Sequence, residues 1–92
     1  MRTVTIDARH IQTVAGLQRY IEYLFDFPAH YGRNLDALHD MLRTRDVQTR
    51  IVLIAAQEPG GELAAYLPRL LRVLEDSAQE NARLQVEWQR AQ

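Results

Sequence analysis

Blocks of apolar and polar positions along the chain predict strands and helices in alternation. The β-branched run at residues 3–6 predicts an opening strand. Residues 13–25 follow with apolar side chains three and four positions apart, which is typical of a helix, and Thr13 suits its N-terminal cap. Pro28 stops that helix, so residues 26–33 are expected to form a connecting loop.

The middle of the chain predicts a second, two-faced helix. Asn34 is a good N-terminal cap for it, and an acidic residue follows in the first turn. Helical spacing divides the segment into an apolar side and a polar side. The apolar side contains Leu35, Leu38 and Leu42 with Met41 beside them, and the polar side contains Asp36, His39, Asp40 and Arg43. Such a helix can be anchored to a core while it holds two carboxylates toward something cationic.

The second half of the chain predicts a buried strand, a helix and a half-exposed strand. Residues 51–56 are apolar without interruption, which indicates a strand covered on both faces at the centre of a parallel sheet. Residues 59–61, Pro-Gly-Gly, form the clearest break. Residues 66–79 then predict a helix with Pro68 in its first turn. The alternation over residues 84–88 predicts a strand at a sheet edge.

Strands that alternate with helices imply right-handed crossovers and a parallel sheet. With 92 residues the chain is long enough for one domain. We therefore expect residues 1–92 to form a single small α/β domain, a three-stranded parallel sheet packed with helices.

Composition and charge exclude several classes of function. The chain has no Cys, which rules out disulfides and Cys-based zinc sites or nucleophiles. The formal net charge of −1 favours neither nucleic acid nor a membrane surface as a direct partner. The N-terminus lacks the apolar stretch of a signal peptide, so we expect a cytoplasmic protein. We also expect no cofactor.

The segment 28–40 resembles the signature of the barstar family, the small bacterial ribonuclease inhibitors. The matching residues, in order and spacing, are Pro28, Tyr31-Gly32, Asn34-Leu35-Asp36-Ala37-Leu38 and Asp40. The resemblance implies the fold expected above. It further implies an intracellular inhibitor, not an enzyme, that occludes the active site of a secreted microbial-type ribonuclease and is monomeric when free.

The resemblance also implies which residues make contact. Ribonuclease active sites gather cations to hold phosphates, and carboxylates can take the place of those phosphates. By resemblance, Asp40 is the central phosphate mimic, Asp36 the second acidic contact, and Asn34 and the Gly32 backbone lie in the contact loop. Asp76 stands for a Glu that the family carries on its last long helix. The best-known complex of this family is itself the standard example of one dominant acidic contact, and we take that expectation from it.

Four positions depart from the family pattern. His30 stands where the family has a contact Tyr, and His39 where it has a Trp. Arg33 replaces an acidic residue, and Arg43 a small polar one. Residues 26–46 hold four Asp and three Arg, a net charge of −1, so steering toward a basic enzyme is expected to be weak. The arginines could pair with the carboxylates of the same helix or meet acids on a partner.

These departures leave alternatives open. A barstar-like binding module for a partner other than a ribonuclease is favoured by Arg33 and Arg43. A small metal-dependent hydrolase would use the histidines with the nearby acids, and direct nucleic-acid binding ranks last. If His30 and His39 face a cationic site, their protonation should weaken binding as the pH falls. The expected partner-binding set is His30, Gly32, Asn34, Asp36, His39, Asp40, Arg43 and Asp76.

Overall fold

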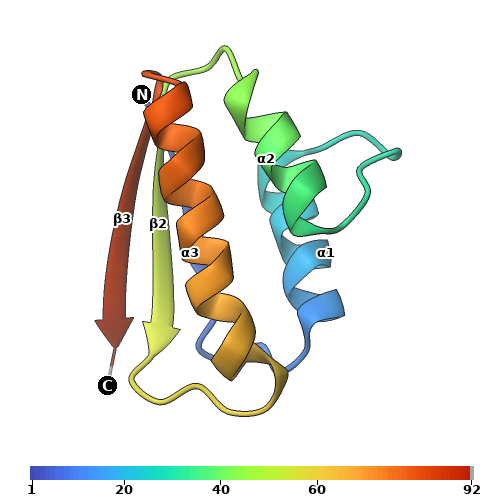
Figure 1. The fold of residues 1–92 in the computed structure, drawn as a ribbon, viewed down its shortest axis with the longest axis vertical. Coiled ribbons are helices and arrows are strands. Elements are labelled where there is room, and N and C mark those ends of the chain that lie inside the picture. The colour runs from blue at the N-terminus through green and yellow to red at the C-terminus, as the bar shows by residue number, and fades with distance from the viewer. Residues whose placement is uncertain (92) are drawn as a thin grey trace.

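The computed structural model describes residues 1–91. The elements in chain order are β1 (Arg2–Asp7), α1 (Val14–Phe25), α2 (Leu35–Arg43), β2 (Thr49–Ala56), α3 (Glu62–Glu80) and β3 (Leu84–Ala91) (Figure 1). β2 pairs in parallel with β1 on one side and with β3 on the other. The predicted order of elements, the parallel sheet and the central place of the apolar strand are confirmed.

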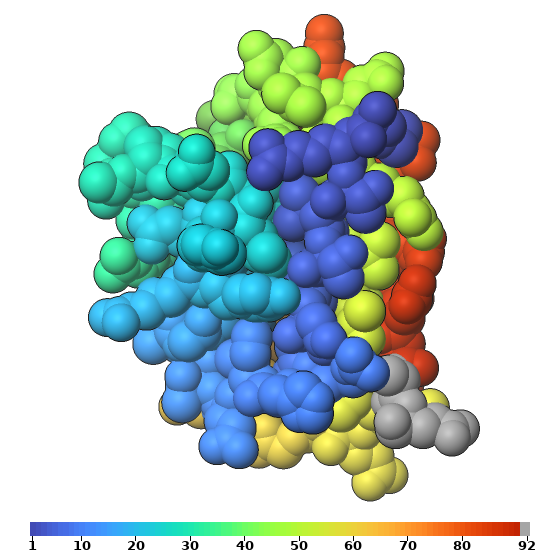
Figure 2. All heavy atoms as spheres, turned by 180° about the vertical axis from the view of Figure 1, so that it is seen from behind, coloured from blue at the N-terminus to red at the C-terminus, as the bar shows by residue number. Residues whose placement is uncertain are grey.

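Helices cover only one face of this sheet, so the prediction that β2 is covered on both faces is wrong for the second face. Figure 2 shows that second face, where the three strands lie side by side at the surface. The strands follow each other in the order β1-β2-β3. Right-handed connections between strands added in one direction all pass over the same face. On the open face Val52 is buried, whereas Arg50 and Ile54 stay half-exposed.

The core lies between the sheet and the helices. Its sheet side includes two rows of side chains that the register places next to each other. The rows are Val4, Ile51 and Val86, and Ile6, Leu53 and Trp88. Among the helices of residues 1–91, none has the length and hydrophobicity that a bilayer span requires.

Hydrogen bonds at both ends of α1 define where the helix begins and ends. The Thr13 side chain accepts a hydrogen bond from the first turn, which confirms the predicted cap. At the other end Asp26 takes a left-handed conformation with φ of 54°. The Asp26 amide donates to the Tyr23 carbonyl at 3.2 Å, and the Phe27 amide donates to the Glu22 carbonyl at 3.1 Å. This pair of bonds closes the helix before Pro28.

α3 begins at Glu62, four residues earlier than predicted, so Pro68 lies inside the helix and not in its first turn. The predicted break is confirmed, because Gly61 has a positive φ of 60° and directly precedes the helix. Leu63 is buried and lies one turn before the buried Tyr66 and Leu67, so the inner side of the helix begins before residue 66. Pro68 is exposed, so the carbonyl that its missing N–H leaves free lies on the solvent side of the helix.

Candidate functional site

The loop that leads into α2 is fixed by a buried hydrogen-bonded network. The Tyr31 hydroxyl donates to Gln18 Oε1 of α1 at 2.5 Å, and Gln18 Nε2 donates to the Tyr66 hydroxyl of α3 at 2.6 Å. Phe27 packs on the Tyr31 ring with centroids 4.8 Å apart. Burial raises the pKa of the Tyr31 phenol, so the hydroxyl remains a donor. Tyr31 of the loop is thereby bonded directly to α1 and, through Gln18, linked to α3.

The next three residues set the start of α2. Asn34 Oδ1 accepts a hydrogen bond from the Ala37 amide at 2.8 Å, which confirms the predicted cap. Asn34 Nδ2 donates to the Gly32 carbonyl at 3.2 Å. A Cβ atom on Gly32 would lie 3.2 Å from Asn34 Nδ2 and 3.3 Å from the Ala37 Cβ, so a larger residue here would push these neighbours by a few tenths of an ångström. Arg33, between them, has φ of 54° and donates from Nε to Glu22 Oε1 at 3.0 Å.

α2 is two-faced as predicted. Leu38 and Leu42 are fully buried, whereas Asp36 and Asp40 are exposed on the outer side. The C-terminal end of α2 is held by the buried side chain of Asn81, whose Nδ2 donates to the Leu42 carbonyl at 2.9 Å and to the carbonyl of residue 45 at 2.8 Å. Both ends of the helix are therefore fixed, which limits how far the two carboxylates can move.

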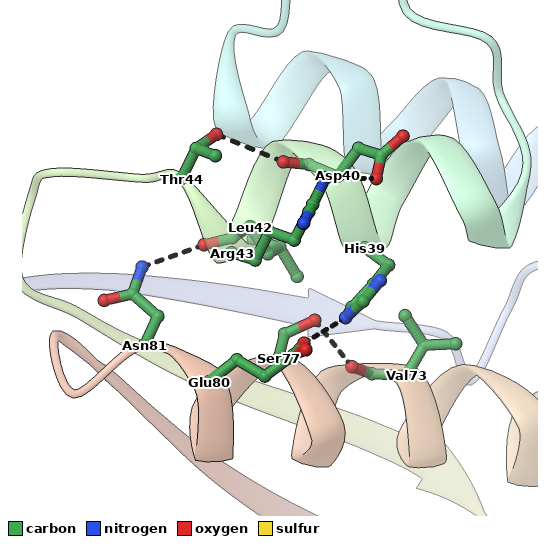
Figure 3. A network of polar contacts seen from close by, with 9 residues as sticks. All are labelled: His39, Asp40, Leu42, Arg43, Thr44, Val73, Ser77, Glu80 and Asn81. Atoms are coloured by element: carbon green, nitrogen blue, oxygen red, sulfur yellow. Dashed lines mark hydrogen bonds and ion pairs between the residues drawn. The ribbon is translucent and has the colours of Figure 1, made fainter.

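His39 differs from the prediction that placed it on the outer side of α2. It is half-buried and its Nε2 pairs with Glu80 of α3, as Figure 3 shows. The position lies between the buried and exposed sides of the helix, where the nearest neighbour is α3. In the same view the Asp40 carboxylate points away from α3. His39 therefore joins the two helices and is only partly available to a partner.

Arg33 and Arg43 form ion pairs with different carboxylates. Arg43 Nη2 lies 3.3 Å from Asp40 Oδ1, and both side chains are more than half exposed. Exposed pairs of this kind contribute at most about 1 kcal/mol, so Arg43 holds Asp40 only weakly. Arg33 pairs with Glu22 and not with Asp36. Asp36 forms no ion pair with any residue from 1 to 91.

The remaining predicted residues lie at the borders of this helix pair. Asp76 is exposed on α3, one turn before Glu80 and therefore on the side of α3 that borders α2. His30 is exposed in the turn that the Tyr31 amide closes on the Pro28 carbonyl at 2.9 Å. We call the exposed parts of both helices the α2–α3 surface. It comprises Asp36, His39, Asp40 and Arg43 of α2 and Arg69, Asp76 and Glu80 of α3.

Sequence reasoning missed the residues that hold this surface in place. Gln18 carried a usable signal, because it is a polar residue among the inner apolar positions of α1, next to Leu17 and one turn before Ile21. Glu80 and Asn81 carried none, since their partners lie about forty positions away in the sequence and are brought near only by the packing of α3 on α2.

The side chains of residues 1–91 form no cluster of three or more His, Asp or Glu placed to hold a metal ion. His39 is directed to Glu80, whereas His30 lies in the preceding turn. The geometry therefore gives no support to the metal-dependent hydrolase.

Two comparisons with known proteins agree with this geometry. Residues 1–90 match the sequence profile of the Barstar (barnase inhibitor) family. The chain is also 33% identical over 81 residues to a Bacillus subtilis (strain 168) protein named "Putative ribonuclease inhibitor YrdF", an alignment that covers 87% of this chain and 89% of that protein. Together with the three-stranded parallel sheet and its helices, these matches show that the chain belongs to the barstar family.

Proposed function

We propose that this protein binds a ribonuclease and blocks its active site with the α2–α3 surface, Asp40 at the centre and Asp36 beside it. The observation that carries the proposal is the exposure of these two carboxylates on a helix that is buried on its other side and capped at both ends. Membership of the barstar family and the likeness to a protein named as a ribonuclease inhibitor support it.

The inhibition needs no chemistry from the inhibitor. A ribonuclease holds phosphates with Arg, Lys and His, and carboxylates placed at the same points form charge-assisted hydrogen bonds with them. Because α2 is already fixed, little conformational entropy is lost on binding. Gly32 and Asn34 lie in the loop at the N-terminal end of α2, where they would form the border of the contact.

We further propose where this inhibition takes place and in which form. The protein would act in the cytoplasm as a monomer and neutralise a ribonuclease that is later secreted. Asp76 and Glu80 would extend the contact from α2 onto α3, and the Asp40–Arg43 pair would open when the enzyme binds. That pair is weak, so its opening costs at most about 1 kcal/mol.

The test is a titration into a panel of small secreted microbial ribonucleases, followed by RNA cleavage. Asp40→Ala should weaken inhibition by about 30-fold or more, since hot-spot side chains contribute at least about 2 kcal/mol. Asp46→Ala is the matched control, because Asp46 is exposed but lies beyond the end of α2. Equal inhibition by both variants would show that α2 is not the site. Absence of inhibition throughout the panel would contradict the ribonuclease proposal.

The pH expectation now depends mainly on His30. His39 already pairs with Glu80, whereas His30 is exposed, and a positive charge there would oppose a cationic enzyme. Weaker inhibition at lower pH stays a prediction, which His30 carries. His30→Asn should remove most of this dependence, and an unchanged dependence in that variant would refute the assignment to His30.

One observation favours a second candidate, a barstar-like binding module for a protein other than a ribonuclease. Arg43 is paired with the central carboxylate, so the α2–α3 surface is mixed in charge and not purely acidic. Such a module would leave every ribonuclease of the panel active. It would instead retain a protein from its native cytoplasm that the Asp36→Ala/Asp40→Ala variant does not retain.

A further inference from the structure

A cleft of about 230 Å³ lies beside the acidic centre, between the N-terminal turns of α1 and α2 and the first half of α3. Arg33 and Arg69 line it together with Asp36, and the half-buried side chains of Val14 and Leu35 add apolar surface. We call it the Arg33–Arg69 cleft. Its lining residues carry two guanidinium groups and one carboxylate. Two further carboxylates contact the lining, because Glu22 pairs with Arg33 and Glu62 accepts a hydrogen bond from the Val14 amide.

Arg33 is held in the cleft by its backbone and by one side-chain bond. Its left-handed φ of 54° is uncommon for a residue other than glycine, and it is maintained between the buried Tyr31 and the Asn34 cap. The guanidinium donates to Glu22 through Nε. Its two terminal amino groups have no partner among residues 1–91, and they remain able to bind a planar acceptor.

Arg69 lies over an aromatic ring and forms no ion pair within residues 1–91. Its guanidinium lies 5.9 Å from the centroid of the Tyr66 ring, and Tyr66 is itself fixed by Gln18. No carboxylate of residues 1–91 lies within ion-pair distance of Arg69. A guanidinium without an ion-pair partner keeps its N–H donors free, and the planar group can bind a carboxylate with two parallel hydrogen bonds.

We propose that the Arg33–Arg69 cleft receives an acidic side chain of the protein partner. The inference rests on the proposed function, because the cleft adjoins the carboxylates that would enter the enzyme. The apolar lining suits the methylene groups of a Glu or Asp, and the two arginines suit its carboxylate. A nucleic-acid phosphate is disfavoured here, since Asp36 and Asp40 stand next to the cleft and would repel the neighbouring phosphates.

The consequence is selectivity. A partner must present a cationic groove to Asp40 and an acidic residue to the adjoining cleft. A ribonuclease that is cationic at both places meets Arg33 and Arg69 with like charge, and like-charge contacts suppress wrong partners. The arginine that replaces an acidic residue of the family pattern at position 33 would thus narrow the range of enzymes that this chain inhibits.

The test compares Arg69→Glu with Arg72→Glu in the same ribonuclease panel. Both changes reverse one exposed charge on α3, but Arg72 does not line the cleft. For an enzyme that the native protein inhibits, Arg69→Glu should weaken inhibition by about tenfold or more, and Arg72→Glu by about threefold or less. Replacement of the facing acidic residue of the enzyme by Lys should restore inhibition by Arg69→Glu. Equal effects of the two variants would overturn the proposal.

The remaining outcomes separate this inference from the proposed function. If Asp40→Ala abolishes inhibition while Arg69→Glu does not, the cleft proposal fails and the proposed function stands. Some enzymes of the panel will have no acidic residue opposite the cleft. If the native protein does not inhibit such an enzyme but Arg33→Ser/Arg69→Ser does, the two arginines exclude that enzyme, as proposed. If no form inhibits any enzyme, both fail. Circular dichroism of each variant, with Arg69→Gln as a milder change, verifies that the fold is retained.

Discussion

The network of Gln18, Tyr31 and Tyr66 offers the sharpest test of how the fold holds the site. Gln18 is 1% exposed, and it accepts from one tyrosine hydroxyl and donates to the other. Gln18→Leu keeps a side chain of similar size but removes both bonds. The Tyr31 hydroxyl then lacks its acceptor, and the Tyr66 oxygen lacks its donor, at a place where all three side chains are buried.

The expected loss of stability follows from the two polar groups left without partners. Each buried group that loses its hydrogen bond costs about 1–3 kcal/mol, so Gln18→Leu should lower the free energy of unfolding by about 2–6 kcal/mol. Domains of this kind are stable by about 5–15 kcal/mol in total. Removal of the hydroxyls as well, in Gln18→Leu/Tyr31→Phe/Tyr66→Phe, should recover most of the loss, because no polar group is then left unpaired.

Equilibrium unfolding in urea provides the assay, followed by far-ultraviolet circular dichroism and by the fluorescence of Trp88. The native protein, the single variant and the triple variant should unfold in the order single, triple, native as urea is raised. A cost below about 0.5 kcal/mol for Gln18→Leu would refute the reasoning, since even one orphaned hydroxyl exceeds it. A triple variant less stable than the single one would show that the tyrosine hydroxyls have other partners.

Three further predictions concern the two faces of α2, the end of α1 and the response to acid. Leu38→Ala should lower the free energy of unfolding by about 2–5 kcal/mol, whereas Asp40→Ala should leave the urea midpoint nearly unchanged, because only Leu38 is buried. Asp26→Gly should raise stability by about 0.5–1 kcal/mol, since glycine takes the left-handed conformation there without strain; a lower melting temperature would contradict this. A hydrogen bond from Arg9 lowers the pKa of Asp7 to about 2, below the ~3.9 of an unfolded carboxyl. The contribution of the Arg9–Asp7 hydrogen bond to the free energy of unfolding is present above about pH 4 and is lost as the pH falls through 2. The free energy of unfolding of Asp7→Asn should therefore depend less on pH in that interval than that of the native protein.

Local features of the site were predictable because they depend on neighbouring residues. The caps at Thr13 and Asn34 and the buried side of α2 follow from residue type and helical spacing, and the structure confirms them. The start of α3 was missed because Pro68 was taken as a mark of the first turn. The apolar spacing that includes Leu63 is the stronger signal, since burial of one more side chain decides where the helix begins.

The arrangement of layers was only partly predictable. A continuous apolar strand indicates burial, but it does not say whether helices or neighbouring side chains provide it. Val52 is 5% exposed although no helix covers its face, and the Arg50–Glu87 pair lies on that same face with a 2.5 Å contact. Only the strand order decides which face the crossovers cover, and strand order is a long-range property that the spacing of residues does not encode.

Net charge proved a poor guide to the electrostatics of the α2–α3 surface, because what matters is which charges are already paired. The sequence left open whether the arginines neutralise the carboxylates of their own helix. In the structure Arg33 turns to Glu22 on α1, Arg43 makes a weak pair with Asp40, and Asp36 keeps its charge unpaired within residues 1–91. The surface is therefore a pattern of separate acidic and basic points and not a diluted acidic face. A pattern selects partners by position as well as by sign, so a change of a few charged residues can alter which partner such a surface fits without any change in the fold.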